Sequence, residues 1–265
     1  MRQRLPSVTG LPTVVTGASS GIGRSLALEL ARRGARVALL ARRERELAEV
    51  SDEIARSGGD SLIVPCDITN HREIAEAAEF VESHLGVVEL LVNNAGIGSH
   101  QRFLDLEIGE LERTLQVNLV GAAAVTKAFL PSMVSRGRGW LVFVASVAGR
   151  VSTPSESAYV ASKAGLIGLA ESLSLEVEDT GIHVLTVCPG IVRTPFFGHE
   201  GPPNVNSRWS VQVEPEDLSL AILRSLAKGH RRLTFPRKIS ASYLAQVIAP
   251  EWTRRQVERA ARRES

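Results

Sequence analysis

The feature of this sequence that most constrains its fold is the regular alternation of short apolar runs with longer segments of helical periodicity. The apolar runs are rich in β-branched residues and carry few polar positions, as in RVALLA (36–41) and WLVFVAS (140–146). Runs of this kind are typical of a parallel sheet that helices cover on both faces. The alternation therefore predicts an α/β fold with a doubly wound parallel sheet of about seven strands.

The segments between these runs predict helices, among them a long one at about 104–135, one at about 156–178 and a shorter one near 216–228. With 265 residues, 44% of them apolar and 23% charged, the chain has an ordinary globular composition. No repeat, low-complexity tract or linker divides it. We expect one domain over residues 1–265, with a core at about 12–236 and a helical, arginine-rich C-terminal extension at about 239–265.

The net charge of +2 equals the excess of arginine in the last fifteen residues, which hold five arginines and three glutamates. The rest of the chain is balanced, which argues against a nucleic-acid partner. The basic N-terminus lacks the apolar region of a signal peptide, and no run of eighteen apolar residues occurs. We therefore expect a cytoplasmic protein without a transmembrane segment. Cys66 and Cys188 lack metal-ligand spacing, so we predict no metal site.

The stretch TGASSGIG (16–23) follows the first predicted strand and opens the first predicted helix. In that context Gly17 permits a tight turn, Gly21 lets the backbone approach a pyrophosphate, and Gly23 allows close helix packing. The N-terminus of the helix favours the anion. The stretch therefore predicts a dinucleotide site on a Rossmann-type sheet, in preference to an ordinary tight turn.

The end of the second predicted strand indicates which dinucleotide binds. An enzyme that prefers NAD usually places an acidic residue there to hold the ribose 2′-hydroxyl, but this chain has Ala41 followed by Arg42 and Arg43. Guanidinium groups offer forked donors that suit a 2′-phosphate. We predict NADP(H) as the cofactor, with Arg42 on its phosphate. The alternative is an ordinary solvated helix start, which suits Arg43 better than Arg42.

Two polar stretches follow strands at the same predicted sheet edge. Asp67 either accepts a hydrogen bond from the adenine amino group or caps the next helix, a role for which Thr69 and Asn70 compete. The run NNAG (93–96) either lines the adenine-ribose side of the site or forms a turn.

Tyr159 and Lys163 lie four positions apart in an alanine-rich segment predicted to be helical. Positions so spaced differ by about 40° around the helix axis and about 6 Å along it, so the two side chains share a face. Lowering the pKa of a phenol from about 10 to about 7 requires roughly 4 kcal/mol. A cation about 4 Å away in a partly buried site supplies on the order of 4 kcal/mol. The pair therefore predicts a tyrosine acid/base whose pKa Lys163 lowers, provided that the site is buried.

Ser146 and Asn118 are weaker signals when each is taken alone. Ser146 ends the fifth apolar run and either hydrogen-bonds a substrate oxygen or caps a turn. Asn118 lies within the long predicted helix, where an asparagine often faces water or bonds the backbone.

Taken together, these residues resemble the classical short-chain dehydrogenase/reductase family, and the resemblance covers about 12–236. Six family motifs occur in the family's order and spacing. They are the TGxxxGIG loop at 16–23, NNAG at 93–96, the helical asparagine at Asn118, the serine at Ser146, YxxxK at Tyr159 and Lys163, and the PG turn at Pro189 and Gly190.

The resemblance implies that Tyr159 is the catalytic acid/base, that Lys163 lowers its pKa and holds the nicotinamide ribose, and that Ser146 orients the carbonyl or alcohol. It implies that Asn118 positions a water that relays protons through Lys163. It also implies that residues 191–194 close over the nicotinamide, with the Thr194 hydroxyl near its carboxamide. The cofactor-contacting residues expected on this basis are Gly17, Ser19, Ser20, Gly21, Ile22, Gly23, Arg42, Asp67, Ile68, Asn94, Ala95, Gly96, Tyr159, Lys163, Pro189, Gly190, Val192 and Thr194.

The expected activity is reversible, NADP(H)-dependent hydride transfer between the nicotinamide and a carbonyl compound or secondary alcohol. The segment after Gly190 carries Phe196, Phe197 and Trp209, which either form an apolar substrate site or pack the segment onto the body or another subunit. The other function class open to this sequence is a regulatory protein that binds a dinucleotide on the same fold without turnover.

The C-terminal extension departs from the simplest family members. Its apolar residues are spaced as one helix stripe: Tyr243, Leu244, Val247, Ile248 and Trp252. We expect this stripe to pack on the body or on a subunit, with a peripheral membrane contact as the alternative. The family's common assemblies imply a homodimer or homotetramer built partly through the helices of Asn118 and Tyr159.

Overall fold

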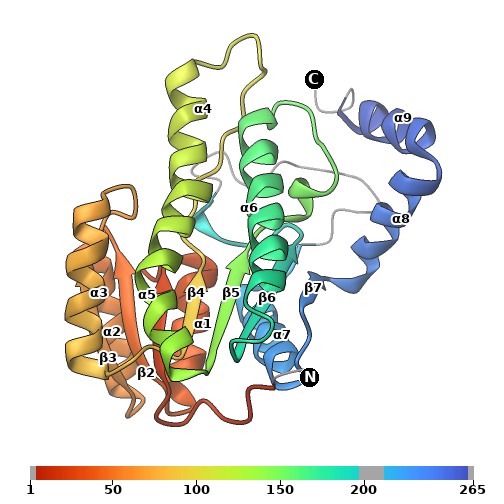
Figure 1. Ribbon diagram of the computed structural model, residues 1–265. Helices are drawn as coiled ribbons and strands as arrows, with labels where there is room; N and C mark the ends of the chain where they lie inside the picture. Colours follow the sequence, from red (N-terminus) through yellow and green to blue (C-terminus); the bar gives the residue numbers. More distant parts are fainter. Residues whose placement is uncertain (1–3, 197–211, 262–265) are drawn as a thin grey trace.

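The computed structural model describes residues 4–196 and 212–261, which form a sheet with helices on both sides (Figure 1). The seven strands of this sheet pair in parallel in the order β3-β2-β1-β4-β5-β6-β7. Their bounds are β1 Pro12–Thr16, β2 Arg36–Ala41, β3 Asp60–Pro65, β4 Leu90–Asn93, β5 Gly139–Val144, β6 Ile182–Pro189 and β7 Arg232–Phe235. The predicted doubly wound parallel sheet is confirmed. Its strand order reverses between β1 and β4, which is where such sheets open a crevice for ligands.

Helices cover each face because alternate residues of every buried strand point to opposite sides. Val15 and Val92 pack into one apolar cluster, whereas Val14 and Leu91 pack into the other. The first cluster is closed by α1 (Gly21–Arg32), α2 (Glu44–Arg56) and α7 (Pro215–Ala227). The second is closed by α3 (His71–Leu85), α5 (Ala122–Arg136) and α6 (Ser157–Glu176), which lie in front of the sheet in Figure 1.

The prediction of one continuous helix at about 104–135 is wrong in two respects. Residues up to Glu107 form a loop, so that α4 (Ile108–Leu115) begins later, and a π-helical turn, η1 (Gln116–Gly121), separates α4 from α5. Tertiary contacts accompany the wide turn: a Cβ at Gly121 would lie 2.8 Å from the Ile68 carbonyl oxygen. Since those contacts come from elsewhere in the chain, the helical periodicity does not reveal the turn.

The C-terminal extension forms two helices, not one, beyond the edge strand β7 (Figure 1). After a 3₁₀ turn, η4 (Arg237–Ile239), come α8 (Ser240–Ile248) and α9 (Pro250–Ala261). Ala249 leaves the helical conformation with φ −136°, as is expected before a proline. The predicted single stripe is therefore broken: Ile248 is 72% exposed and Trp252 is 51% exposed. The side chains of Leu244 and Val247 lie outside the described residues.

Among the described residues, one helical run, Ile108–Arg136, is long and apolar enough to cross a membrane by length and composition. This is a weak indication, because the core helix of a globular fold passes the same test. Val125, Phe129 and Met133 of this run are fully buried in the cluster against the sheet.

Candidate active site

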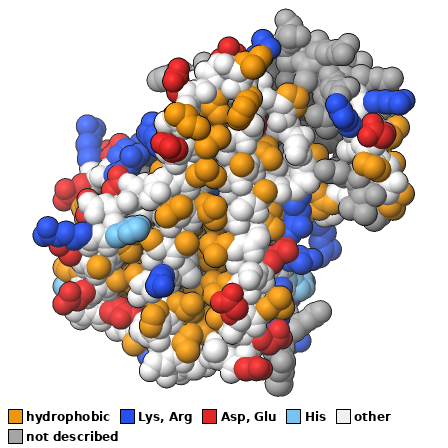
Figure 2. Space-filling model, turned by 45° about the horizontal axis from the view of Figure 1, so that its top comes forward, with side chains coloured by type: hydrophobic (Ala, Val, Ile, Leu, Met, Phe, Trp, Pro, Cys, Tyr) orange, Lys and Arg blue, Asp and Glu red, His pale blue; other side chains and the backbone are white. Residues whose placement is uncertain are grey.

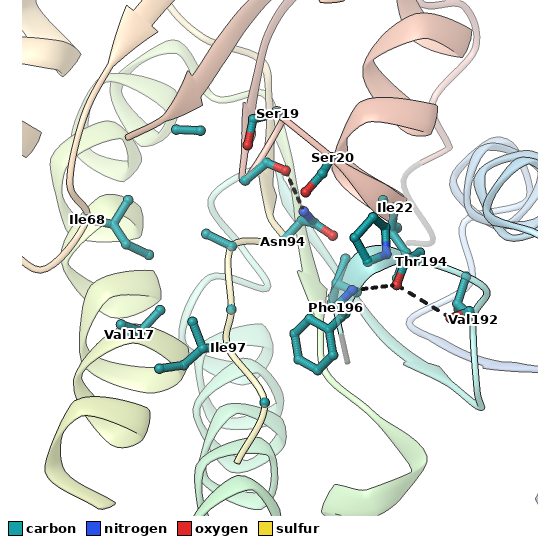
Figure 3. Close-up of a pocket in the computed structure, with 18 of the residues that line it drawn as sticks. Ser19, Ser20, Ile22, Ile68, Asn94, Ile97, Val117, Val192, Thr194 and Phe196 are labelled. Carbon is teal, nitrogen blue, oxygen red and sulfur yellow. Dashed lines mark hydrogen bonds between the residues drawn. The ribbon is translucent and has the colours of Figure 1, made fainter. Parts of the chain in front are cut away.

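A cavity of about 450 Å³ lies along the carboxyl ends of the central strands. It is lined by every residue predicted for the site except Gly23 and Asn118, which are buried behind it. Figure 3 shows Ser19, Ser20 and Asn94 at one side of it and Phe196 at another. Residues that are not among the predicted cofactor contacts also line the cavity, namely Leu40, Ala41, Arg43, Cys66, Ile97, Gly98, Val117, Val144, Ala145, Pro195 and Phe196.

The glycine loop requires its glycines for two different reasons. Gly17 and Gly21 have φ +66° and φ +55°, values that residues with a Cβ rarely adopt. A Cβ at Gly23 would overlap the Gly17 carbonyl oxygen and lie 2.5 Å from Asn94 Nδ2. Ser20, the N-cap of α1, makes no side-chain hydrogen bond to the helix. The Ser20 side chain thus leaves the first backbone N–H groups of α1 without a capping partner, and these groups can bind an anion.

The two arginines after β2 differ in what they contact. Arg43 Nη2 donates to Ser19 Oγ at 3.0 Å and to Ser20 Oγ at 3.1 Å, so its guanidinium lies on the glycine loop. Arg42 is 58% exposed, and its Nη1 lies 3.9 Å from Asp67 Oδ2. Arg43 is therefore the arginine held against the loop, whereas both arginines line the cavity and the contact of Arg42 with a 2′-phosphate stays a prediction.

The residues after β3 and β4 mainly fix the backbone around the cavity. Asp67 does not cap α3; that cap is Asn70, whose Oδ1 accepts from the N–H groups of the first turn. Asp67 Oδ1 instead accepts from the backbone N–H and hydroxyl of Thr69, at 2.9 and 2.8 Å. Asn94 Nδ2 donates to the Thr16 carbonyl oxygen at 2.9 Å, which ties NNAG to the start of the glycine loop.

At the other end of the cavity, Ser146 and Lys163 are buried and Tyr159 is partly buried. Ser146 opens a 3₁₀ turn, η2 (Val147–Gly149), and its Oγ accepts from the Ala148 N–H at 3.1 Å. Lys163 Nζ lies 5.8 Å from the centroid of the Tyr159 ring and donates to the Val144 carbonyl oxygen at 3.1 Å. The two possibilities for Ser146 are therefore compatible, because it caps a turn and lines the cavity.

Burial sets the pKa values of the pair. It raises the pKa of Tyr159 to about 12, a rise that a hydrogen bond with Ser146 partly offsets and the charge of Glu156 increases. Burial also lowers the pKa of Lys163 to about 8. Desolvation is the first cause of the shift at Tyr159, and the ammonium of Lys163 is hydrogen-bonded to Val144. The lowering of the Tyr159 pKa by Lys163 stays a prediction.

Both N–H donors of the Asn118 amide and its oxygen have protein partners. Its Oδ1 accepts from the Ile97 N–H at 2.8 Å, and its Nδ2 donates to the Ile97 carbonyl oxygen and to Ser162 Oγ, both at 2.9 Å. The side chain therefore has no free N–H donor, whereas its Oδ1 keeps a second lone pair; the predicted role of Asn118 in positioning a relay water stays a prediction. It fixes the segment that lines the cavity between Asn94 and Gly98.

Phe196 and Thr194 close the cavity from the segment after β6. A Cβ at Gly21 would lie 3.1 Å from Thr194, so residues near 194 lie over the glycine loop. The Phe196 ring lies 5.8 Å from the Tyr159 ring, centroid to centroid, and a Cβ at Gly98 would lie 3.2 Å from it. Figure 3 shows this ring beside the strand end that carries Asn94 and Ile97. Phe197 and Trp209 lie outside the described residues.

Residues 12–203 match the family described as short chain dehydrogenase. The chain belongs to this family. It is 35% identical over 243 residues to the oxidoreductase UcpA of Salmonella typhimurium (strain LT2), which covers 90% of this chain and 88% of that protein.

Two solved structures of short-chain dehydrogenases are also similar. One is a 7α-hydroxysteroid dehydrogenase complexed with NADH and 7-oxo glycochenodeoxycholic acid, with a TM-score of 0.80, 27% identity and coverage of 86% of this chain and 93% of that one. The other is a metagenomic short-chain oxidoreductase in complex with NADP, with a TM-score of 0.72, 33% identity and coverage of 83% and 91%. This protein is thus an oxidoreductase of the short-chain dehydrogenase type on a dinucleotide-binding, Rossmann-type fold.

The cavity of this short-chain dehydrogenase fits the nicotinamide dinucleotide that the family binds. Its volume of about 450 Å³ lies in the range of small-molecule sites. The backbone is bare at Gly21 and at Gly96, where a Cβ would lie 3.3 Å from Lys163 Nζ and 3.0 Å from Asn118 Oδ1. Side chains at these two positions would fill space next to the glycine loop and next to Lys163, where the pyrophosphate and the nicotinamide ribose of a dinucleotide would lie.

Proposed function

We propose that this short-chain dehydrogenase is an NADP(H)-dependent enzyme that interconverts a carbonyl group and a secondary alcohol on a small apolar molecule. The observation that carries the proposal is that Ser146, Tyr159 and Lys163 line the same cavity as the glycine loop. When bound, the nicotinamide supplies or accepts the hydride. The protein's own residues position the substrate and move its proton.

Tyr159 is the proposed acid/base. With a pKa raised to about 12 by burial, its phenol holds its proton at neutral pH and is ready to donate it to the oxygen of a carbonyl. Ser146 lies close enough to this phenol to lower its pKa, and both side chains line the cavity, so the Ser146 hydroxyl can orient the same oxygen. In alcohol oxidation the proton moves the other way, from the alcohol to the Tyr159 phenolate. The nearby positive charge of Lys163 would stabilise that phenolate.

Lys163 is the proposed ligand of the nicotinamide ribose. Among the described residues, Val144 takes one hydrogen bond from its ammonium, which carries three donors. The remaining donors would bind ribose hydroxyl groups near Gly96, where the backbone leaves room. Asn118 supports this arrangement indirectly, through Ile97 and Ser162.

The preference for NADP(H) over NAD(H) is supported by the end of β2, where Ala41 stands in place of a carboxylate and two guanidinium groups follow. Arg43 already bonds the Ser19 and Ser20 hydroxyl groups, so these three side chains form a cluster of donors that suits a 2′-phosphate. Arg42 also lines the cavity, and its Nη1 lies 3.9 Å from Asp67 Oδ2. Family membership alone does not decide the cofactor, since one similar structure holds NADP and another holds NADH.

The apolar character of the substrate is supported by the residues around Tyr159. Phe196 faces its ring, and Ile97 and Val117 also line the cavity. A substrate carbonyl that reaches Tyr159 would therefore place its carbon substituents against apolar surface.

We also propose a homodimer or homotetramer with contacts through α5 and α6. Figure 2 shows hydrophobic side chains gathered in a broad band over the face on which α4, α5 and α6 lie, and Val120 and Leu175 are among the exposed ones. A Leu175→Glu variant should have a lower mass by light scattering, because a charge opposes burial there. An unchanged mass would exclude Leu175 from the contact. We further propose that the chain forms one domain and that the protein is cytoplasmic. The cytoplasmic location is supported by the two cysteines, which are free and buried.

The test of the reaction is a panel of ketones and aldehydes assayed with NADPH and with NADH, together with the reverse panel of alcohols. We expect turnover of an apolar carbonyl compound with NADPH. Tyr159→Phe should lower kcat by about 10² to 10⁴ and leave the Kd for NADPH within about twofold of the wild-type value. A wild-type protein that binds NADPH and turns over no compound of either panel would favour the alternative, a dinucleotide-binding regulatory protein.

A further inference from the structure

Arg150 directly follows the turn that carries Ser146. It ends η2, and its backbone N–H donates to the Val147 carbonyl oxygen at 2.9 Å. The turn has little freedom against α6, because a Cβ at Gly149 would lie 2.7 Å from the carbonyl carbon of Lys163. Arg150 thus lies directly after a turn that is packed on the backbone of Lys163.

The guanidinium of Arg150 joins three other elements to this loop. Its Nη2 donates to Glu171 Oε1 of α6 at 2.6 Å. Burial raises the pKa of the Cys188 thiol in β6 and the guanidinium partly offsets this rise, so the guanidinium lies close to the residue before Pro189 and Gly190, which line the cavity. Its Cζ lies 5.8 Å from the centroid of the Tyr243 ring in α8, within the range of a cation–π contact.

The C-terminal extension touches the same region at a second point. Ile239, at the end of η4, packs on the PG turn so closely that a Cβ at Gly190 would lie 2.5 Å from its Cδ1. The Tyr243 ring is partly buried, and burial raises the pKa of its phenol to about 12. Tyr243 thus presents an uncharged aromatic face to the guanidinium over the whole working pH range.

We propose that Arg150 is a positioning residue for the active centre and that the ring of Tyr243 in the C-terminal extension holds it in place. The proposal rests on the proposed function, in which Ser146 orients the substrate oxygen beside Tyr159. The guanidinium sets the Ser146 loop against α6 through Glu171 and against the PG turn through Cys188. A misplacement of about 1 Å at such a loop can lower the rate about a hundredfold. Contacts from several elements that hold the Ser146 loop in position would therefore matter for catalysis.

The experiment compares four variants with the wild-type enzyme: Arg150→Met, Tyr243→Ala, Tyr243→Phe and, as a matched control, Arg231→Met. Arg231 makes a similar pair, with Nη2 at 2.6 Å from Glu178 Oε1, and makes no contact with the Ser146 loop among the described residues. The measurements are kcat, the KM for NADPH, the thermal midpoint, and hydrogen exchange of the amides of residues 146–151.

Arg150→Met and Tyr243→Ala should lower kcat by about tenfold to a hundredfold, with the KM for NADPH within about twofold of the wild-type value. Both should also speed hydrogen exchange at residues 146–151. Tyr243→Phe, which keeps the ring, should retain wild-type kcat and exchange, as should Arg231→Met.

A lower thermal midpoint in Arg150→Met and Tyr243→Ala with unchanged kcat would overturn the proposal, since a merely structural contact would do the same. If the wild-type protein has no turnover, the proposed function fails, and hydrogen exchange still decides the positioning role. Equal exchange at residues 146–151 in Tyr243→Ala and wild type would then overturn it.

Discussion

The two ends of the cavity are built from different parts of the chain. At the nucleotide end, the glycine loop is completed by Arg43, which lies fewer than thirty positions from the two serines that it bonds. At the catalytic end, Ser146 depends on α6, β6 and α8, and the support extends to Tyr243. The nucleotide end is therefore fixed mainly by backbone shape, whereas the catalytic end is fixed by buried charges and contacts between distant segments. The two ends should fail differently when they are changed.

The largest effect should come from a methyl group at the nucleotide end. In Gly23→Ala the new Cβ would overlap the Gly17 carbonyl oxygen and crowd Asn94. We expect the Kd for NADPH to rise more than about a hundredfold and the free energy of unfolding to fall by about 1–3 kcal/mol. Fluorescence titration and urea denaturation measure the two quantities.

Gly168→Ala is the matched control, because Gly168 also lies within a helix and a Cβ there meets no atom within 4 Å. This variant should bind NADPH normally and gain about 0.5–1 kcal/mol of stability. Equal affinities in Gly23→Ala and Gly168→Ala would show that backbone shape does not govern this end.

The second-largest effect should come from removing a positive charge at the nucleotide end, which should weaken NADPH binding. Arg43→Ala should raise the Kd for NADPH by about tenfold to a hundredfold, since a hydrogen bond to a charged group contributes about 1.5–3 kcal/mol, and should leave NADH nearly unchanged. Arg42→Ala should have a smaller effect, because the guanidinium of Arg43 and not that of Arg42 is hydrogen-bonded to the glycine loop. Titration of each variant with both cofactors measures the difference. Similar losses for NADPH and NADH would contradict a phosphate contact.

At the catalytic end, pH should act through Lys163. Burial lowers its pKa to about 8, so the ammonium is charged below that pH and neutral above it. The value of kcat/KM for carbonyl reduction should therefore fall by about tenfold per pH unit above about pH 8. In Lys163→Arg this break should disappear, since a guanidinium stays charged. A wild-type profile that remains flat to about pH 10 would mean that the charge of Lys163 is not needed.

The smallest effect should lie away from both ends. His183 in β6 is buried, its Nε2 donates to the His230 carbonyl oxygen at 3.0 Å, and burial lowers its pKa. In the unfolded chain a histidine takes up a proton as the pH falls through about 6.5, whereas the folded chain resists this. Stability from this source is complete above about pH 6.5 and declines below it.

His183→Gln, which keeps an N–H donor, should show a weaker dependence of the free energy of unfolding on pH between about 5 and 7. Urea denaturation measures this dependence, and NADPH binding should not change. An identical pH dependence in the variant and the wild type would assign the acid sensitivity to other groups.

The sheet could be predicted from the sequence because every buried strand is a nearly continuous apolar run, and the cavity position followed from the strand ends. The motif residues Ser146, Tyr159 and Lys163 were correctly expected to share one place. The turn at Gln116–Gly121 could not be predicted, because contacts with Ile68 and Ile97 accompany it and the residues themselves suit an ordinary helix.

Side-chain direction accounts for the other differences. Nothing in the order Arg42, Arg43 reveals which guanidinium reaches the glycine loop, since that depends on how the chain leaves β2. The break at Pro250 could have been read from the proline, which opens α9 and ends the stripe that begins at Tyr243.

The two buried hydrogen bonds that the Asn118 amide donates have a consequence for chemical ageing. Loss of ammonia would turn this side chain into a carboxylic acid of nearly the same size. An aspartate could still accept from the Ile97 N–H, but the Ile97 carbonyl oxygen and Ser162 would lose their donor, and a negative charge would be buried. Deamidation at this one position would therefore inactivate a molecule whose shape remained almost unchanged, and ageing would be detected by mass before it was detected by size.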